Sequence, residues 1–484
     1  MNKKSSWLGW LGLGALLLST AWFLYLGLTT RGTVDGGDSI YHYFHVERTT
    51  QALSSALRLW AKPFYTLVAA PAVALGGFTG LKVFNILSAM AALAGVSLIA
   101  RKLGWKSYGL LPFLGLAAAA FPTYAFSGLT ESFASLILVA TILALLYERP
   151  ALAYLLASLL PYCRSEAKIL LPLFLLYGLY HRHFRELPLL AAGSLIFSLL
   201  GAYYLDDWAW IFESPYQLDS DYYGHGSWLH YLEQLQHMLY APLTALTAIG
   251  ALLGLYRAWQ SPAYRRRTWL LVHLPALAIL AGHTTVWALG IYASAGLARV
   301  LVLVLPLFFL ITLEGLETLY HWSAKLNKTL GIGLVIILLA LCAWMPYERG
   351  IPHYYWKTAL ERSPRHKLVA DSIAPYIEAH YAPFDRLVSD EPYLGMALGI
   401  NMVDSKRIKS WRLMAHDATL FNRAQDLLLW DNRWLAKLKP GPAELAQDPC
   451  WEVVKKWAIK PLGKRQEFIL YERAPACQAL PKAD

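Results

Sequence analysis

The sequence has 484 residues, of which 57% are hydrophobic and 15% are charged. Soluble domains carry roughly 25% charged residues, so this composition excludes an ordinary globular protein and indicates one that crosses a membrane several times. The formal net charge of +11 is typical of membrane proteins with basic cytoplasmic loops, and no basic patch interleaved with aromatic residues indicates nucleic-acid binding.

The first apolar segment, residues 7–28, is predicted to be a retained membrane span. Its apolar run is too long for a signal peptide, and no small-residue cleavage site follows it. Lys3 and Lys4 precede the segment and place the N-terminus in the cytoplasm. Residues 30–77 then form an outer loop, whose last part, 63–75, is apolar but short and carries Pro71, so it is expected to dip into the membrane or to lie at its surface.

Further spans follow along the chain and bring the expected number of transmembrane helices to about eleven. They are predicted at residues 78–100, 108–126, 132–147, 151–161, 169–180, 187–205, 238–256, 268–288, 298–313 and 329–346. With this alternation the proposed inner loops hold more Lys and Arg than the longer outer loops, as the positive-inside rule requires. The transmembrane domain is therefore expected to cover residues 1–347, with a second long outer loop at 206–237.

Residues 348–484 are polar and are expected to form a small soluble α/β domain on the outer side. Their pattern predicts a helix at 366–381 and, from β-branched and aromatic content, strands at 385–390, 451–459 and 467–473. Of the four cysteines, Cys450 and Cys477 lie in this domain and are able to pair in an oxidising compartment, but the sequence does not supply the geometry. The chain has no CxxC motif that would indicate zinc binding.

The polar stretch 35–63 holds the densest group of candidate catalytic side chains. Asp35 and Asp38 flank a Gly-Gly turn, and the helical spacing expected after it puts Asp38, His42 and His45 on one face. Asp38 is interpreted as a helix cap, as a catalytic carboxylate, or as both. The two histidines are interpreted as interfacial hydrogen-bonding groups or, with Asp38, as ligands of a divalent metal ion.

Other charged residues are expected on the same outer side, namely Lys62, Glu131, Arg164, Glu166 and Arg299. Carboxylates beside guanidinium groups suit an anionic lipid headgroup, because arginine binds phosphate in a bidentate manner and a carboxylate accepts the proton of an attacking hydroxyl. Each has a simpler interpretation as well. Glu131 suits a helix start, Arg164 and Glu166 suit a structural ion pair, and Arg299 suits a side chain that snorkels to the interface.

These motifs together resemble the membrane glycosyltransferases of the C superfamily, which include protein O-mannosyltransferases and aminoarabinose transferases. The resemblance covers most of residues 1–350 and is carried by GGDSIYHYF, WAKPFYTL, TESFASLILVATILALLY, PYCRSEAKILLPLFLLY and GLARVLVLVLPLF, followed by an outer soluble tail. The chain departs from the family pattern at Asp38, which stands alone instead of in a tight acidic pair, and at Val300, where Tyr is usual.

The resemblance implies an inverting glycosyltransferase in the inner membrane of a bacterium. Its donor would be a sugar on a polyprenyl phosphate, and its acceptor a lipid, glycan or protein on the extracytoplasmic face. Asp38 would be the general base or hold the acceptor, with Asp35 and Glu131 as further catalytic candidates. Substrate-binding roles are predicted for His42, His45, Lys62, Arg164, Glu166 and Arg299, of which the two arginines would bind the donor phosphate. Some members use a divalent cation and others none, so the resemblance implies no certain cofactor.

Two other classes of function compete with this prediction. A transporter or flippase of lipid-linked glycans should place charged groups at mid-membrane and show repeat symmetry. Here the charges lie near one expected face and no repeat is visible, which favours the enzyme. An assembly protein that works through its tail ranks last, because nothing in residues 348–484 resembles a binding motif. The sequence does not name the sugar or the acceptor.

Overall fold

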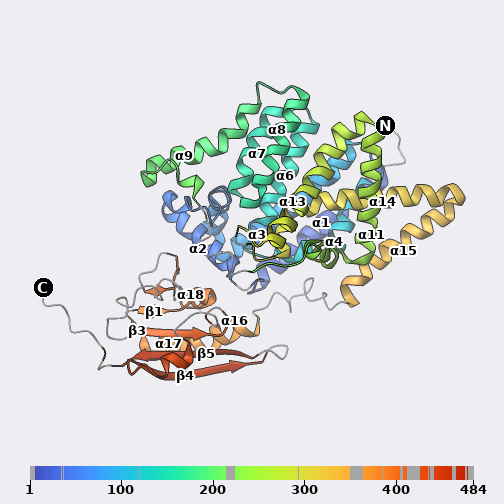
Figure 1. The fold of residues 1–484 in the computed structure, drawn as a ribbon. Coiled ribbons are helices and arrows are strands. Elements are labelled where there is room, and N and C mark those ends of the chain that lie inside the picture. The colour runs from blue at the N-terminus through green and yellow to red at the C-terminus, as the bar shows by residue number, and fades with distance from the viewer. Residues whose placement is uncertain are drawn as a thin grey trace. The chain divides into compact units, whose positions relative to one another are not determined.

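The computed structural model divides the chain into two compact units, which are described separately. It describes residues 6–33, 35, 37–118, 120–213, 224–292, 294–348, 363–384, 386–403, 407–410, 426–433, 435, 441–460, 465–474 and 477. One unit, here called the helical unit, consists of Met1–Thr30 and Thr49–Leu360. The other, here called the α/β unit, consists of Arg31–Arg48 and Glu361–Asp484 (Figure 1).

The helical unit has a helix within every apolar segment that the sequence predicts to be a span. Its helices are α1 (Ser6–Thr29), α3 (Pro63–Lys102), α4 (Leu111–Ala117), α5 (Ala120–Ala125), α6 (Glu131–Leu146), α7 (Pro150–Leu159), α8 (Leu170–His181), α9 (Ala192–Leu205), α11 (His230–Gln260), α12 (Pro262–Tyr264), α13 (Leu274–Leu289), α14 (Leu305–Leu326) and α15 (Lys328–Glu348). Within the described part, 5 helical stretches are long and apolar enough to cross a membrane by length and composition. A total of eleven spans stays a prediction.

Helix α3 joins two segments that the sequence analysis separates. It runs for 40 residues, so the apolar stretch 63–75 continues into the predicted span 78–100 across a kink at Gly76 and Gly77. Gly77 has a φ of 55°, which glycine adopts without the steric cost that a Cβ brings. The backbone at Gly76 and Gly77 is not helical, so α3 consists of two helical stretches, one over residues 63–75 and one over the predicted span 78–100.

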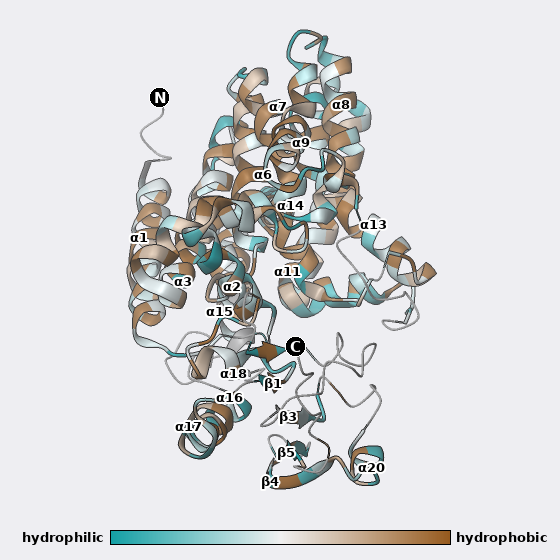
Figure 2. Cartoon of the chain, turned by 90° about the vertical axis from the view of Figure 1, so that its left-hand side faces the viewer, coloured by the Kyte–Doolittle hydropathy of each residue, from teal (hydrophilic) through white to brown (hydrophobic). Residues whose placement is uncertain are grey.

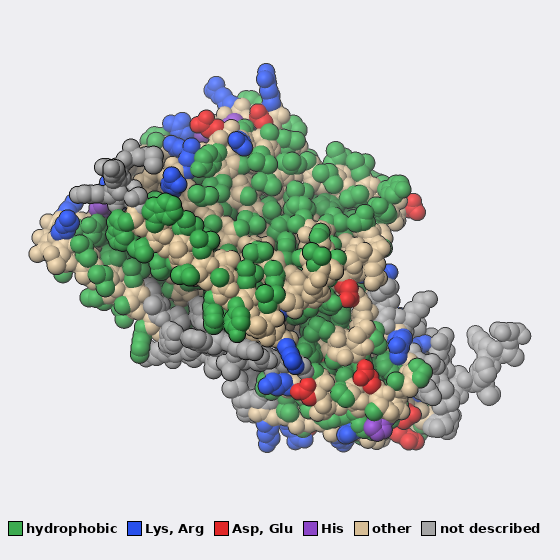
Figure 3. Space-filling model, turned by 180° about the vertical axis from the view of Figure 1, so that it is seen from behind, with side chains coloured by type: hydrophobic (Ala, Val, Ile, Leu, Met, Phe, Trp, Pro, Cys, Tyr) green, Lys and Arg blue, Asp and Glu red, His purple; other side chains and the backbone are tan. Residues whose placement is uncertain are grey.

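The surface of the helical unit is apolar in the way that a lipid-facing surface is. Large side chains point outward from α1, α9 and α11, and Leu18 is 76%, Leu195 61% and Leu252 71% exposed. Figure 2 shows hydrophobic residues along these helices, and Figure 3 shows a broad hydrophobic area with Lys and Arg side chains gathered at one edge. Apolar surface of this extent is not left in contact with water, and the protein is therefore an integral membrane protein.

A buried polar network joins α11, α12, the π-helical segment Arg265–His273 and α14 inside the helical unit. Glu314 of α14, only 2% exposed, accepts hydrogen bonds from Tyr264 at 2.7 Å and lies 3.0 Å from His273 Nε2. Arg257 of α11 forms an ion pair with the same carboxylate at 2.6 Å and donates to Thr318 at 3.1 Å. A carboxylate buried among apolar helices requires such partners, because unpaired charges there are costly.

The α/β unit has the small mixed fold that the sequence predicts. It contains α2 (Asp38–Gln51, of which the last three residues belong to the helical unit), α16 (Pro364–Leu368), a π-helical turn (Val369–Ile373), α17 (Ala374–Tyr381), β1 (Arg386–Val388), α18 (Pro392–Ala397), β2 (Ile408–Lys409), β3 (Asp426–Asp431), α20 (Pro442–Leu445), β4 (Trp451–Ile459) and β5 (Gln466–Arg473). The strand order is β2-β1-β3-β5-β4. Strand β1 pairs in parallel with β2 and β3, whereas β5 pairs antiparallel with β3 and β4.

Residues 31–48 belong to the α/β unit by their contacts, whereas the sequence-based boundary groups them with residues 1–347. The reason is that α2 buries its apolar side chains in the core of that unit. Ile40 and Phe44 lie in one hydrophobic cluster with the residues Val369, Ile373, Ile377, Leu387, Leu394, Leu427 and Leu470. A helix rich in charged and polar groups thus gains an apolar partner surface that its neighbours in sequence do not provide.

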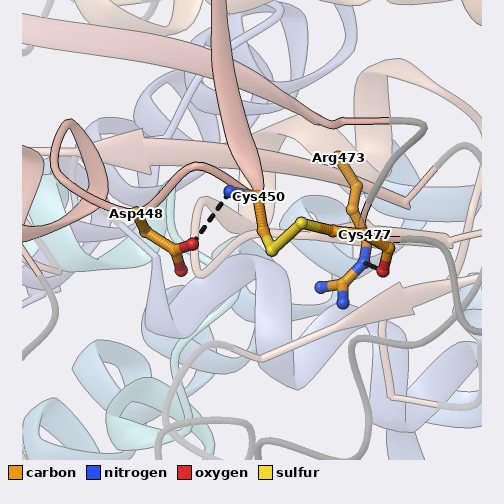
Figure 4. The surroundings of a disulfide bond; sticks show 4 residues. All are labelled: Asp448, Cys450, Arg473 and Cys477. Carbon is orange, nitrogen blue, oxygen red and sulfur yellow. Dashed lines mark hydrogen bonds between the residues drawn. A yellow bond between two sulfur atoms is a disulfide. The ribbon is translucent and has the colours of Figure 1, made fainter.

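The pairing of Cys450 and Cys477, which the sequence leaves open, is present in the structure. The two cysteines form a disulfide with a Cα–Cα distance of 5.3 Å (Figure 4). The amide of Cys450 donates to Asp448 at 2.9 Å, and Arg473 Nε donates to the carbonyl of Cys477 at 3.0 Å. The bond therefore ties the residue before β4 to the segment that follows β5.

Candidate active site

Within the helical unit, the structure brings together the charged residues that the sequence places on the outer side. Glu131 is the first residue of α6 and its side chain is fully buried. Its Oε1 lies 2.9 Å from Arg164 Nη1 and 3.5 Å from Arg299 Nε. Its Oε2 has no hydrogen-bond partner among the described residues. One carboxylate thus holds two guanidinium groups that lie far apart in the sequence.

Arg164 lies at the centre of this cluster. It precedes the 3-10 turn Ser165–Ile169, where its extended backbone directs the side chain back toward α6. It forms ion pairs with Glu131 and Glu166, and Nη1 lies 3.4 Å from Thr130 Oγ1. Burial alone would raise the pKa of Glu166, but the charges of Arg164 and Lys62 outweigh it and lower the pKa to about 2. Glu166 is therefore ionised at any physiological pH.

Lys62 joins the cluster through a backbone conformation that is unusual for its residue type. Its φ of 66° lies in the left-handed region, immediately before the proline that starts α3. Its ammonium donates to Ser165 Oγ at 2.9 Å and to the carbonyl of Leu59 at 3.2 Å, and the residue is only 4% exposed. Burial lowers the pKa of Lys62 to about 8, and the nearby charge of Glu166 opposes this effect. Strained residues of this kind concentrate at functional sites.

Buried polar residues that the sequence analysis does not identify hold the turn before Glu131. Tyr65 of α3 donates to the carbonyl of Gly128 at 2.9 Å. Asn85, which follows the kink of α3, donates to the carbonyls of Ser127 and Leu129 at 2.6 and 2.9 Å. No spacing in the sequence indicates these contacts, because each of them joins residues that are more than forty positions apart.

The segment that carries Arg299 is fixed from α6 as well. Arg299 lies in the 3-10 helix Ala298–Leu303, and Ser135 Oγ donates to the carbonyl of Val302 at 2.6 Å. The Arg299 side chain is 17% exposed and faces the buried carboxylate of Glu131. A residue that only snorkels to the interface would point away from such a partner, so the structure favours the charged-cluster interpretation.

The α/β unit holds the other candidates. Asp35 caps the start of α2, because its Oδ2 accepts from the amides of Ser39 at 2.7 Å and Gly37 at 3.4 Å. Its Oδ1 accepts from Thr33 Oγ1 at 2.8 Å and from the hydroxyl of Ser39. Asp38 is the first residue of α2 and is partly exposed. Capping contacts at the start of α2 are therefore made by Asp35.

His42 and His45 follow on α2 and are 4% and 8% exposed. Among the residues that the structure describes, no group of three or more His, Cys, Asp or Glu side chains is arranged to hold a metal ion. The trio of Asp38, His42 and His45 thus does not form the metal site that the sequence allows. The two groups of candidates belong to different units, and their predicted convergence stays a prediction.

A cavity of about 920 Å³ lies elsewhere in the helical unit, between α1, α4, α14 and α15. Its lining is mostly apolar, with Lys106, Ser107, Glu317 and Tyr320 as its charged and hydroxyl groups. None of the predicted site residues lines it. The charged cluster, and not this cavity, is therefore the candidate active site.

The fold is similar to that of ArnT from Cupriavidus metallidurans. Its crystal structure bound to undecaprenyl phosphate matches with a TM-score of 0.60 and 13% identity over 97% of this chain and 99% of that chain. The apo structure matches with a TM-score of 0.63 and 13% identity over 99% of this chain and 100% of that chain. The predicted resemblance is confirmed as a likeness of fold to ArnT.

The oligosaccharyltransferase of Archaeoglobus fulgidus, tethered to an acceptor peptide, matches with a TM-score of 0.48 and 12% identity over 80% of this chain and 63% of that chain. No family model and no curated protein matches the sequence. At these identities the likeness defines an integral membrane protein with the ArnT fold, and the activity has to be argued from the site.

Proposed function

We propose that the protein is an integral-membrane glycosyltransferase that moves a sugar from a polyprenyl-phosphate donor to an acceptor hydroxyl on the extracytoplasmic face of a bacterial inner membrane. The observation that carries this proposal is the buried cluster of Lys62, Arg164 and Arg299 around Glu131 and Glu166. It holds more cations than carboxylates at one site. It is supported by a fold shared with a protein crystallised with undecaprenyl phosphate.

The cations suit the phosphate of the donor. Guanidinium groups present a planar fork of donors that matches phosphate oxygens, and a buried ammonium adds a point charge. Glu131 holds Arg164 and Arg299 in place before the donor arrives, so that little side-chain freedom is lost on binding. Its unpartnered Oε2 is the reason why Glu131 also stays a candidate for direct contact with a substrate hydroxyl.

Asp38 is the proposed general base. It would accept the proton of the acceptor hydroxyl while that oxygen bonds to the anomeric carbon of the donor sugar. The bond between the anomeric carbon and the phosphate oxygen breaks in the same step, and the polyprenyl phosphate leaves with the electron pair. Attack from the face opposite to the leaving group inverts the anomeric configuration. The cations stabilise the charge that develops on the leaving phosphate.

The test replaces Asp38 with Asn in purified protein reconstituted into liposomes with undecaprenyl phosphate sugars and a panel of lipid and glycan acceptors. Release of undecaprenyl phosphate is measured. Loss of a general base costs on the order of a hundredfold to ten-thousandfold in rate, so Asp38→Asn should fall to near background with an unchanged melting temperature.

Asp35→Asn is the matched control, because Asn caps a helix about as well as Asp and should keep α2 in place. A wild-type rate in Asp38→Asn would exclude Asp38 as the base. Movement of intact lipid-linked sugar across the liposome membrane, with no release of undecaprenyl phosphate by the wild-type protein, would instead identify a flippase.

A further inference from the structure

The helix that carries Asp38 is built into the core of the α/β unit. Ile40 is fully buried and Phe44 is 2% exposed. Both lie in one hydrophobic cluster with Ile377 of α17, Leu394 of α18 and Leu470 of β5. Because Asp38 is the first residue of the same helix, its direction depends on how residues far along the chain hold α2.

Asn401 fixes α2 by a specific set of hydrogen bonds. Its Nδ2 donates to the carbonyl of Phe44 at 2.9 Å and to Glu47 Oε2 at 2.8 Å. Its Oδ1 accepts from the amide of Val403 at 3.0 Å, which orients the amide group. The other oxygen of Glu47 accepts from Tyr43 at 2.5 Å. Apolar packing alone would let a helix rotate slightly, whereas these directed bonds define one orientation.

The preceding turn faces charged residues of the same unit. The carboxylate of Asp35 acts electrostatically on Arg433, which follows β3, and on His366 of α16. His366 is 1% exposed and its ring stacks on Tyr393 at a centroid distance of 4.3 Å. Residues of the C-terminal sequence thus interact with the segment 31–48 at Asp35, before Asp38, and at Phe44 and Glu47, after it.

We infer that Asn401 is a positioning residue for the proposed transfer, and that the C-terminal domain holds the catalytic helix in its working orientation. Asn401 acts through α2 and touches no reacting atom. The inference rests on the proposed function for its catalytic consequence. Its structural part, the dependence of α2 on Asn401, does not.

The test is Asn401→Asp in the full-length protein. The substitution keeps the shape of the side chain, removes both donated hydrogen bonds and sets a carboxylate against that of Glu47. The rate constant kcat should fall roughly tenfold to a hundredfold, as misplacement of a catalytic group does, while KM for the undecaprenyl phosphate sugar stays unchanged. Hydrogen exchange of the α2 amides should become faster.

A second substitution tests the mechanism by rescue. In Asn401→Asp combined with Glu47→Gln, the new amide at position 47 can donate to the new carboxylate at position 401. This pair should recover part of kcat and slow the exchange of α2 again, an outcome that general destabilisation of the fold would not give. If Asn401→Asp fails to fold, Asn401→Ser removes the same donors without adding a charge.

Asn432→Asp is the control in the same unit. Asn432 donates to the carbonyl of Arg465 at 3.0 Å and accepts from the amide of Glu467 at 3.0 Å, so the substitution removes one donated side-chain hydrogen bond away from α2. It should keep the wild-type kcat. Wild-type kcat and unchanged exchange of α2 in Asn401→Asp would overturn the inference. Faster exchange of α2 in Asn401→Asp, together with no transferase activity in the wild-type protein, would refute the proposed function alone.

Discussion

Lys62 is a side chain whose proposed phosphate binding and whose contribution to stability both depend on pH. Its ammonium is buried and bonded to Ser165, and burial lowers its pKa to about 8. The folded protein therefore favours the neutral amine more than the unfolded chain does. Between about pH 8 and the unperturbed value of 10.5, the contribution of Lys62 to stability rises with pH. Its ability to attract a phosphate changes in the opposite direction, because the charge is lost.

We predict that kcat/KM for the polyprenyl-phosphate donor decreases as the pH rises through about 8. The pH dependence of kcat/KM reflects the pKa values of groups in the free enzyme, so the ratio should follow the charge on Lys62. In Lys62→Arg the guanidinium stays charged, and the decrease should disappear from a pH profile measured between 6 and 10. An identical decrease in Lys62→Arg would assign the titration to another group. The melting temperatures of both proteins show whether the larger side chain is tolerated.

At the scale of elements, directed polar contacts between helices add to apolar packing. The network around Glu314 joins α11 and α14, and Gly250 and Gly315 let these two helices approach closely. A Cβ on Gly315 would meet the carbonyl oxygen of Leu246 at 2.0 Å. Because α14 begins directly after the turn with Arg299, this helix pair also bears on the geometry of the charged cluster.

We predict that Glu314→Gln destabilises the helical unit by about 1–2 kcal/mol, the lower part of the range for a buried hydrogen-bonding group that loses its partner. The lower part is expected because Arg257 is 43% exposed and regains water. Thermal unfolding in detergent is the measurement. Glu317→Gln is the control on the same helix, since Gln still accepts from the amide of Ser107, now 3.0 Å away. Equal melting temperatures for the two variants would contradict the prediction.

At the scale of the whole molecule, a segment near the N-terminus folds together with the C-terminal part of the chain. Residues 361–484 fold together with 31–48, so the α/β unit is assembled from one segment that lies between two parts of the helical unit in the sequence and one segment that follows it. The disulfide between Cys450 and Cys477 supports the proposed extracytoplasmic side, since such bonds persist in oxidising compartments. It also limits the freedom of the unfolded C-terminal segment.

We predict that Cys450 and Cys477 resist alkylation in membranes isolated from cells until a reductant is added. Mass spectrometry of the alkylated protein reads this out peptide by peptide. Replacing both by Ser should destabilise the α/β unit by about 2–4 kcal/mol, a typical contribution of a disulfide, and should make its unfolding insensitive to reductant. Full alkylation without reductant would place this unit in the cytoplasm and reverse the topology.

The sequence by itself determined the apolar helices, the polar C-terminal domain and the identity of the charged candidates. Hydrophobic runs, prolines and β-branched strands are local signals, which is why 451–459 coincides with β4. The sequence also indicated the family fold through short motifs such as GGDSIYHYF. It was ambiguous at Asp35 and Asp38, because both suit a turn that starts a helix.

Only the tertiary structure decided which of these residues meet. Three sets of contacts join residues that are tens to hundreds of positions apart. They are the ion pairs of Glu131 with Arg164 and Arg299, the hydrogen bond from Lys62 to Ser165, and the hydrogen bond from Asn401 to Glu47. Spacing along a helix or strand carries no information on such pairs, because they depend on how elements pack. The same reason explains why residues 31–48 were grouped with the membrane part, although burial of Ile40 and Phe44 assigns them to the α/β unit.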